Sequence, residues 1–227
     1  KDIDDLLRFL PRQRQTLFFS ATINPEIKKL AYSLVQNPIR IQISPKDPIS
    51  KNVDHAVCFI EMDDKRFFLE RFYKEHEDKK ILAFVRTKVR AERVVKAMER
   101  ADIKALSLHG DKDQKSRTKA LENFKSGKIR LLIATDVSAR GIDIQGVDFV
   151  INYDLPEQAE NYVHRIGRTG RGRARGQAIS FCSEHERPLL QSIEEYIYQP
   201  VKELSIEKAE YLETIDLALG NSKRLDD

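Results

Sequence analysis

Short apolar runs alternate with longer amphipathic segments along most of the chain, and this alternation limits the possible folds more than any other feature. The predicted strands cover 55–61, 81–85, 104–108, 130–134, 148–152 and 177–182. The predicted helices between and after them cover 64–76, 87–101, 113–126, 158–166 and 184–197. Most strands are nearly continuous apolar runs, which is typical of strands buried on both faces. The sequence therefore predicts an α/β fold with helices on both faces of a parallel sheet.

The first 43 residues repeat this pattern on a smaller scale. A helix over 2–10 stops at Pro11, and strand 15–20, helix 25–36 and strand 39–43 follow. Two strands and two helices are too few to bury a core by themselves. We therefore expect this segment to belong to a domain that begins outside the chain, or to pack on the main domain. A further hypothesis pairs its open strand edges with a second copy, as a homodimer through residues 1–43.

Two prolines interrupt the pattern after these 43 residues. Pro45 and Pro48 lie in a stretch without an apolar pair, so 44–53 is predicted to be a linker. The main domain is predicted over 54–205. Residues 206–227 are predicted to form a C-terminal helix and tail, with the helix over 206–218 stopped by Gly220.

Composition excludes some classes of protein and leaves others open. The chain has a net charge of +4, and no apolar run approaches the roughly 20 residues that cross a bilayer. Its two cysteines, Cys58 and Cys182, lie in apolar runs, so we expect buried thiols in a reducing, cytoplasmic location rather than disulfides or a metal site. The charge is unevenly placed, because five arginines and no acid occur between His164 and Gly176. This segment is predicted to seek anions.

One polar segment directly follows a predicted strand. Residues 134–143 read ATDVSARGID, in which Thr135 and Asp136 can cap a short helix. Ligands of open α/β sheets bind beyond the carboxyl ends of the strands, so a phosphate or sugar is expected here. The alternative is that Thr135, Asp136 and Asp143 only cap a helix and a turn.

The arginine segment has a regular spacing. Arg165 and Arg168 are three residues apart on a predicted helix and would share a face. Arg168 and Arg171 have the same spacing and can project toward one anion. Guanidinium forks suit the oxygens of a phosphoryl group in transfer. The alternative is a basic loop on a nucleic-acid-binding face.

Four motifs in a fixed order resemble a known family. SAT at 20–22, HGD at 109–111, ATDVSARGID at 134–143 and YVHRIGRTGR at 162–171 resemble motif III, the motif IV region, motif V and motif VI of DEAD-box RNA helicases. The likeness extends to the predicted helix at 184–197 and more loosely resembles the bacterial RhlE-type branch. It implies that 54–205 is the second RecA-like domain, the helicase C-terminal domain. Residues 1–43 would be the C-terminal remnant of the first, ATP-binding RecA-like domain.

The resemblance also assigns roles to single residues. Arg168 and Arg171 resemble arginine fingers that reach the γ-phosphate of ATP, and Asp143 matches the carboxylate that holds the ribose. Arg140 is implied to couple the nucleotide site to the RNA side. Ser20 and Thr22 match the element that couples hydrolysis to strand separation, and His164 is implied to join this interdomain network. The residues implied to grip the RNA backbone, with little sequence preference, are Arg86, Gly110, Arg117 and Thr135.

Two expected motifs of the family do not occur in this sequence. There is no G-x-x-x-x-G-K-[ST] phosphate loop and no DEAD tetrapeptide. We therefore expect ATP and Mg²⁺ to be shared with the first domain, and we expect the 227-residue chain to be inactive alone as a fragment of an ATP-dependent RNA helicase. One alternative is a non-catalytic RNA-binding module with a helicase fold, and another is a DNA-directed helicase of the same superfamily.

Overall fold

A parallel sheet organises the larger of two units in the chain. The computed structural model describes residues 2–11, 13–19, 25–35, 37–41, 49–139, 144, 146–170 and 175–223. The chain divides into Lys1–Pro45 and Lys46–Asp227. Within the described part of the larger unit the sheet has seven strands in the order β3-β4-β2-β5-β6-β1-β7. Their bounds are β1 (Val53–Phe59), β2 (Ile81–Phe84), β3 (Ala105–Leu108), β4 (Leu131–Ala134), β5 (Phe149–Asn152), β6 (Gly176–Cys182) and β7 (Lys202–Glu203).

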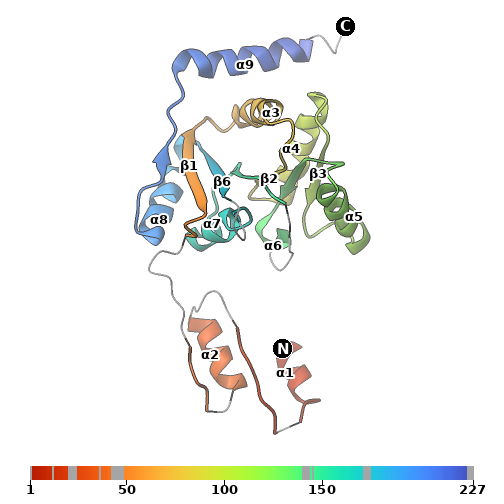
Figure 1. Ribbon diagram of the computed structural model, residues 1–227, viewed down its shortest axis with the longest axis vertical. Coiled ribbons are helices and arrows are strands. Elements are labelled where there is room, and N and C mark those ends of the chain that lie inside the picture. Colours follow the sequence, from red (N-terminus) through yellow and green to blue (C-terminus); the bar gives the residue numbers. More distant parts are fainter. Residues whose placement is uncertain are drawn as a thin grey trace. The chain divides into compact units, whose positions relative to one another are not determined.

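Helices cover both faces of this sheet (Figure 1). One face packs against α3 (Lys65–Glu75) and α4 (Lys88–Arg100), and α9 (Lys208–Lys223) lies against α3. The other packs against α5 (Gln114–Lys125), the short α6 (Asp136–Ala139), α7 (Ala159–Ile166) and α8 (Arg187–Ile197), which a 3-10 turn, η1 (Glu184–Glu186), precedes. Every strand pair is parallel. The predicted fold class is therefore confirmed.

The central strands show why continuous apolar runs form this sheet. In β2, Ile81 and Ala83 face one buried cluster while Leu82 and Phe84 face the other. Successive side chains of a strand point to opposite faces, so both sets must be apolar when both faces are covered. The four side chains are almost completely buried.

Two helices begin directly beyond carboxyl ends of strands. At the start of α4, the Thr87 hydroxyl oxygen accepts a hydrogen bond of 3.1 Å from the backbone N–H of Arg90. At the start of α5, the carboxylate of Asp113 accepts one of 2.8 Å from the N–H of Ser116. These caps satisfy N–H groups that otherwise have no partner in the first helical turn. They orient both helix N-termini toward the same edge of the sheet.

The C-terminal helix differs from its prediction. The helix α9 begins at Lys208 and continues through Gly220 to Lys223, so Gly220 does not stop it. Glycine inside a helix costs only about 1 kcal/mol relative to alanine, and nothing lies within 4 Å of the position of a Cβ there. Tyr211 anchors the helix on α3, donating a hydrogen bond of 2.8 Å to the carboxylate of Asp64 and packing against Phe68.

The predicted linker also contains residues of the main domain. Ile49 is buried in the core, and Val53 begins β1. Residues 42–48 lie outside the described residues. The sequence pattern did not predict β7, which has two residues. None of the described helices is long and apolar enough to cross a membrane.

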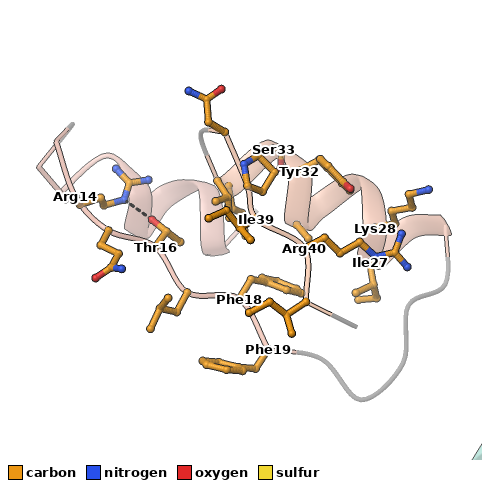
Figure 2. Close-up of a pocket in the computed structure, with 18 of the residues that line it drawn as sticks. Arg14, Thr16, Phe18, Phe19, Ile27, Lys28, Tyr32, Ser33, Ile39 and Arg40 are labelled. Atoms are coloured by element: carbon orange, nitrogen blue, oxygen red, sulfur yellow. Dashed lines mark hydrogen bonds between the residues drawn. The ribbon is translucent and has the colours of Figure 1, made fainter. Parts of the chain in front are cut away.

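The smaller unit contains the two predicted helices but not the two predicted strands. The helices are α1 (Asp2–Leu7) and α2 (Pro25–Leu34). Among the described residues, 13–19 and 37–41 are extended without strand pairing, because a strand needs a hydrogen-bonded neighbour. A groove of about 1070 Å³ lies between them and α2, lined among others by Phe19, Ile27 and Ile39 (Figure 2). Phe19 and Ile39 are 87% and 90% exposed.

Candidate functional site

The carboxyl edge of the sheet gathers the four residues predicted to grip RNA. Arg86, Gly110 and Thr135 follow β2, β3 and β4, which are neighbours in the sheet. The N–H of Thr135 donates to the carbonyl oxygen of Leu108 at 3.2 Å, which joins the ends of β3 and β4. Arg117 lies in the first turn of α5, the helix that begins beyond β3. The structure therefore brings these positions to one edge, and their contact with RNA stays a prediction.

A histidine and a glutamate hold the loop that contains Gly110. His109 is buried, and its Nε2 lies 2.7 Å from Oε1 of Glu92 on α4. The same carboxylate accepts hydrogen bonds from the Ser107 hydroxyl at 2.6 Å and from Lys112 Nζ at 3.0 Å. Burial acts to raise the pKa of Glu92, but these hydrogen bonds outweigh it and lower the pKa to about 2. Glu92 is therefore ionised at neutral pH and ties α4 to this loop.

Arg165 does not point toward the surface in this structure. Its side chain is almost completely buried, and the guanidinium forms two hydrogen bonds with the carboxylate of Asp136, at 2.6 and 2.8 Å. A third bond of 2.7 Å goes to the carbonyl oxygen of Asp154, and the guanidinium lies over the ring of Phe84. Helix α7 ends at Ile166, so Arg168 lies beyond it and does not share a helical face with Arg165.

Asp136 therefore has a role that the sequence pattern did not predict. It begins α6 directly after Thr135. The sequence pattern predicted it only as a helix cap and gave no sign of its pairing with Arg165. A buried arginine with a two-pronged carboxylate partner holds two elements in a fixed relation. The pair connects the carboxyl edge of the sheet to α7, the helix that leads to Arg168.

The opposite, amino edge of the sheet holds Thr169 and Gly170, which belong to the arginine-rich segment between His164 and Gly176, called the arginine loop below. The Thr169 hydroxyl lies 2.8 and 3.0 Å from the carbonyl oxygens of Val147 and Asp148, just before β5. Gly170 has a φ of +67°, and a Cβ there would lie 2.7 Å from the carbonyl oxygen of Asn52, just before β1. Arg168 immediately precedes this anchored segment and is partly exposed. Arg168, which is predicted to reach a nucleotide, thus lies away from the carboxyl edge, where the sequence pattern predicted a phosphate or sugar.

Five predicted site residues lie outside the described residues: Ser20, Thr22, Arg140, Asp143 and Arg171. His164 is described, and its Nε2 lies 3.9 Å from Oε1 of Glu160 in the same helix. Its predicted role between domains stays a prediction.

Comparison with known proteins identifies the family. The helicase conserved C-terminal domain family matches residues 64–173. The chain is 36% identical over 210 residues to the ATP-dependent RNA helicase RhlB of Shewanella amazonensis, covering 92% of this chain and 48% of that protein. The E. coli DEAD-box protein SrmB, solved with regulator of ribonuclease activity A, matches with a TM-score of 0.65 and 34% identity, over 69% of this chain and 92% of that one.

A third similar protein was solved with ligands. S. cerevisiae Dbp5 bound to RNA and ADP BeF3 matches with a TM-score of 0.77 and 28% identity, over 96% of this chain and 57% of that one. The chain therefore belongs to the DEAD-box helicase family and contains the RecA-like C-terminal domain of that family. It spans about half the length of the curated relatives it matches, 48% in the case of this RhlB.

Proposed function

We propose that this chain is the C-terminal half of an ATP-dependent RNA helicase that remodels duplex RNA. The observation that carries the proposal is the Arg165–Asp136 pair, which joins an edge with candidate RNA contacts to the helix that leads to Arg168. A pure RNA-binding module would not need an arginine motif at the opposite edge. The name of RhlB, an ATP-dependent RNA helicase, and the structure of Dbp5 bound to RNA support RNA as the substrate.

RNA is gripped through its backbone in this proposal. Arg86 and Arg117 supply charge for phosphates, while Gly110 and Thr135 allow close approach at the ends of β3 and β4. Contacts to phosphate and sugar position a protein without reading bases, so little sequence preference is expected. The N-termini of α4 and α5 add partial positive charge at this edge.

ATP is shared with an ATP-binding half in this proposal. The residues present suit a triphosphate, because the guanidinium groups of Arg168 and Arg171 match phosphoryl oxygens, and Asp143 would accept from the ribose. Arg140 would link this site to the RNA side. The nucleotide, when bound, supplies the free energy for closing and reopening the two halves. Mg²⁺ would be held by the other half, whose motifs this sequence lacks.

The test is RNA-stimulated ATP hydrolysis on mixing this chain with a separately produced ATP-binding domain of a DEAD-box helicase. We expect neither part to hydrolyse ATP alone, and the mixture to do so when RNA is added. Arg168→Ala and Arg171→Ala should each lower the rate by about 10³-fold or more, the range for arginine fingers. The control is Arg175→Ala, an exposed arginine at the other end of the same loop. RNA binding without any ATPase would favour the non-catalytic binding module instead.

We propose that the smaller unit, Lys1–Pro45, packs against the rest of the ATP-binding half of the same protein. Ser20, Thr22 and His164 would then act between the halves, in coupling hydrolysis to strand separation. The exposed apolar side chains at Phe19 and Ile39 support a covering partner. A homodimer through residues 1–43 is the alternative, and a monomer in light scattering at high protein concentration would count against it. Placement in the cytoplasm and in the RhlE-type branch stays a prediction.

A further inference from the structure

A buried ion pair lies directly behind Arg86, outside every motif described above. The Lys65 side chain on α3 is fully buried, and its Nζ donates hydrogen bonds to the carboxylate of Glu186 and, at 2.8 Å, to the carbonyl oxygen of Tyr153. Glu186, the last residue of η1, is 2% exposed. Burying two charges is costly unless each is fully hydrogen-bonded, so such a pair needs an explanation.

Glu186 holds Arg86 as well as Lys65. Its Oε1 accepts from Nη2 of Arg86 at 3.0 Å and from the N–H of Leu155 at 3.0 Å. Its Oε2 accepts from the N–H and hydroxyl of Ser183 at 3.1 and 3.0 Å. Burial acts to raise the pKa of Glu186, but Lys65 and these hydrogen bonds outweigh it, so the pKa lies below its ordinary value. The carboxylate is therefore charged and fixed in place.

The backbone of Arg86 is fixed by the same part of the molecule. Its N–H donates to Oδ2 of Asp154 at 3.1 Å, and the other carboxylate oxygen of Asp154 lies 3.4 Å from Nε of Arg90. Within the described part of the chain, the Arg86 guanidinium makes its hydrogen bond through Nη2, which leaves Nε and Nη1 for a ligand. The side chain of Arg86 is 35% exposed.

This cluster has an excess of positive charge at the surface. Among its described members, Lys65, Arg86 and Arg90 are cations, and Glu186 and Asp154 are carboxylates, which leaves +1. Arg86 is the most exposed of the three cations. An anion that binds there meets a guanidinium whose conformation is already fixed, so less side-chain entropy is lost on binding.

We propose that Glu186, held by Lys65, is a positioning residue that orients Arg86 toward an RNA phosphate. This inference rests on the proposed function, in which Arg86 contacts the RNA backbone. This positioning role and simple charge repulsion predict opposite changes in RNA affinity when Glu186 loses its charge. Removing a carboxylate near a polyanion should strengthen binding if charge alone matters. If Glu186 positions Arg86, its removal weakens binding although a negative charge is lost.

The test compares four variants of the full 227-residue chain in binding a fluorescent single-stranded RNA, by anisotropy at several salt concentrations. Arg86→Ala should weaken binding about tenfold, the effect of about one charge-assisted hydrogen bond, and lower the salt slope by about 0.7. Glu186→Gln should weaken binding by a similar factor. In the Arg86→Ala background, Glu186→Gln should have no further effect, because it acts through Arg86. Glu184→Gln is the matched control, since Glu184 lies in the same turn, is exposed and pairs with Arg187.

The outcomes separate the two proposals. If wild type does not bind RNA, the proposed function fails and this inference with it. If Arg86→Ala weakens binding but Glu186→Gln leaves it unchanged or strengthens it, only the positioning role is wrong. The same conclusion follows if Glu186→Gln weakens binding equally with and without Arg86. Should Glu186→Gln fail to fold in a thermal melt, Glu186→Asp takes its place, because it keeps the charge but withdraws it from Arg86.

Discussion

The two edges of the sheet hold their candidate functional residues by different means. At the carboxyl edge, charged side chains are held by buried ion pairs that reach across the sequence, as between Arg165 and Asp136. At the amino edge, the arginine loop is held at its base by close backbone contact. A Cβ on Gly176 would lie 2.1 Å from the backbone nitrogen of Gly170. One edge therefore depends on charge, and the other on glycines and on the uncharged hydroxyl of Thr169.

This difference has a mechanical consequence. Ion pairs fix the direction of side chains that must meet a ligand from a rigid surface. Glycine contacts instead fix the backbone at Gly170 and Gly176, where an added side chain would clash. In the proposed enzyme the carboxyl edge would face RNA, and Arg168, close to Gly170 in the sequence, would face ATP. Substitutions that remove charge should therefore damage one edge, and substitutions that add atoms the other.

The largest effect on stability is expected from breaking the buried pair at the carboxyl edge. Asp136→Ala leaves the Arg165 guanidinium buried without its carboxylate partner. Removing one member of a buried pair costs about 3–5 kcal/mol, although the partial exposure of Asp136 reduces this. Urea unfolding monitored by circular dichroism would measure the loss. An unchanged midpoint would show that the pair does not hold this edge.

The next effect concerns the amino edge. Gly176→Ala places a methyl group against Gly170 and Thr169, which should destabilise the domain by about 1–3 kcal/mol, as overpacking does. The control is Gly220→Ala, where nothing lies within 4 Å, and helix propensity predicts a gain of up to about 1 kcal/mol. The difference between the two alanine variants in the same unfolding assay tests the claim. Equal stability of the two variants would contradict it.

A smaller effect should follow from removing the Thr169 hydroxyl. Thr169→Val keeps the shape of the side chain but leaves the carbonyl oxygens of Val147 and Asp148 without this donor. We expect a loss of about 1–3 kcal/mol in unfolding free energy. In the reconstituted ATPase, the variant should also raise the amount of ATP needed for half-maximal rate, because Arg168 is adjacent. A loss of stability with unchanged ATP dependence would separate the anchor from the arginine.

The smallest effect is a dependence of stability on pH through Glu92. Its pKa falls from the ordinary 4.5 to about 2 on folding. The contribution is therefore present above about pH 4.5 and is lost as the pH falls toward 2. Because the Glu92 side chain is 40% exposed, solvent screening reduces the effect to about 1 kcal/mol. Glu92→Gln should reduce the difference in stability between pH 5 and pH 2, while Glu99→Gln, on the same helix, should not.

The sequence predicted the main domain closely where the pattern was local. The strands β2 to β6 and the helices between them lie within about two residues of their predicted bounds, because apolar runs and capping residues are local signals. The strands at 15–20 and 39–43 were wrong within the described residues, because strand formation depends on a neighbour that local pattern cannot supply. The predicted helix end at Gly220 was also wrong, because an isolated glycine weakens a helix without ending it.

The candidate site was predicted less completely than the fold. Residues such as Arg86 and Thr135 could be named from the resemblance to DEAD-box helicases, but Lys65 and Glu186 are 121 positions apart and share no motif. One signal was available, because Lys65 occupies the apolar face of its helix, in line with Leu69 and Phe72. A lysine at such a position indicates a buried partner, although only the fold identifies it.

By itself, the sequence determined the parallel sheet and the order of its helices, because these follow from the local periodicity of apolar residues. It also contains the motifs that resemble the DEAD-box family. The tertiary structure alone decided which arginine of the motif at 162–171 is buried. Arg165 and Arg168 are three positions apart in one motif, yet the first is buried against Asp136 and the second lies beyond the helix end. The reason is physical: a guanidinium is buried only where a carboxylate from another element meets it, and that meeting depends on the packing of α6 against α7.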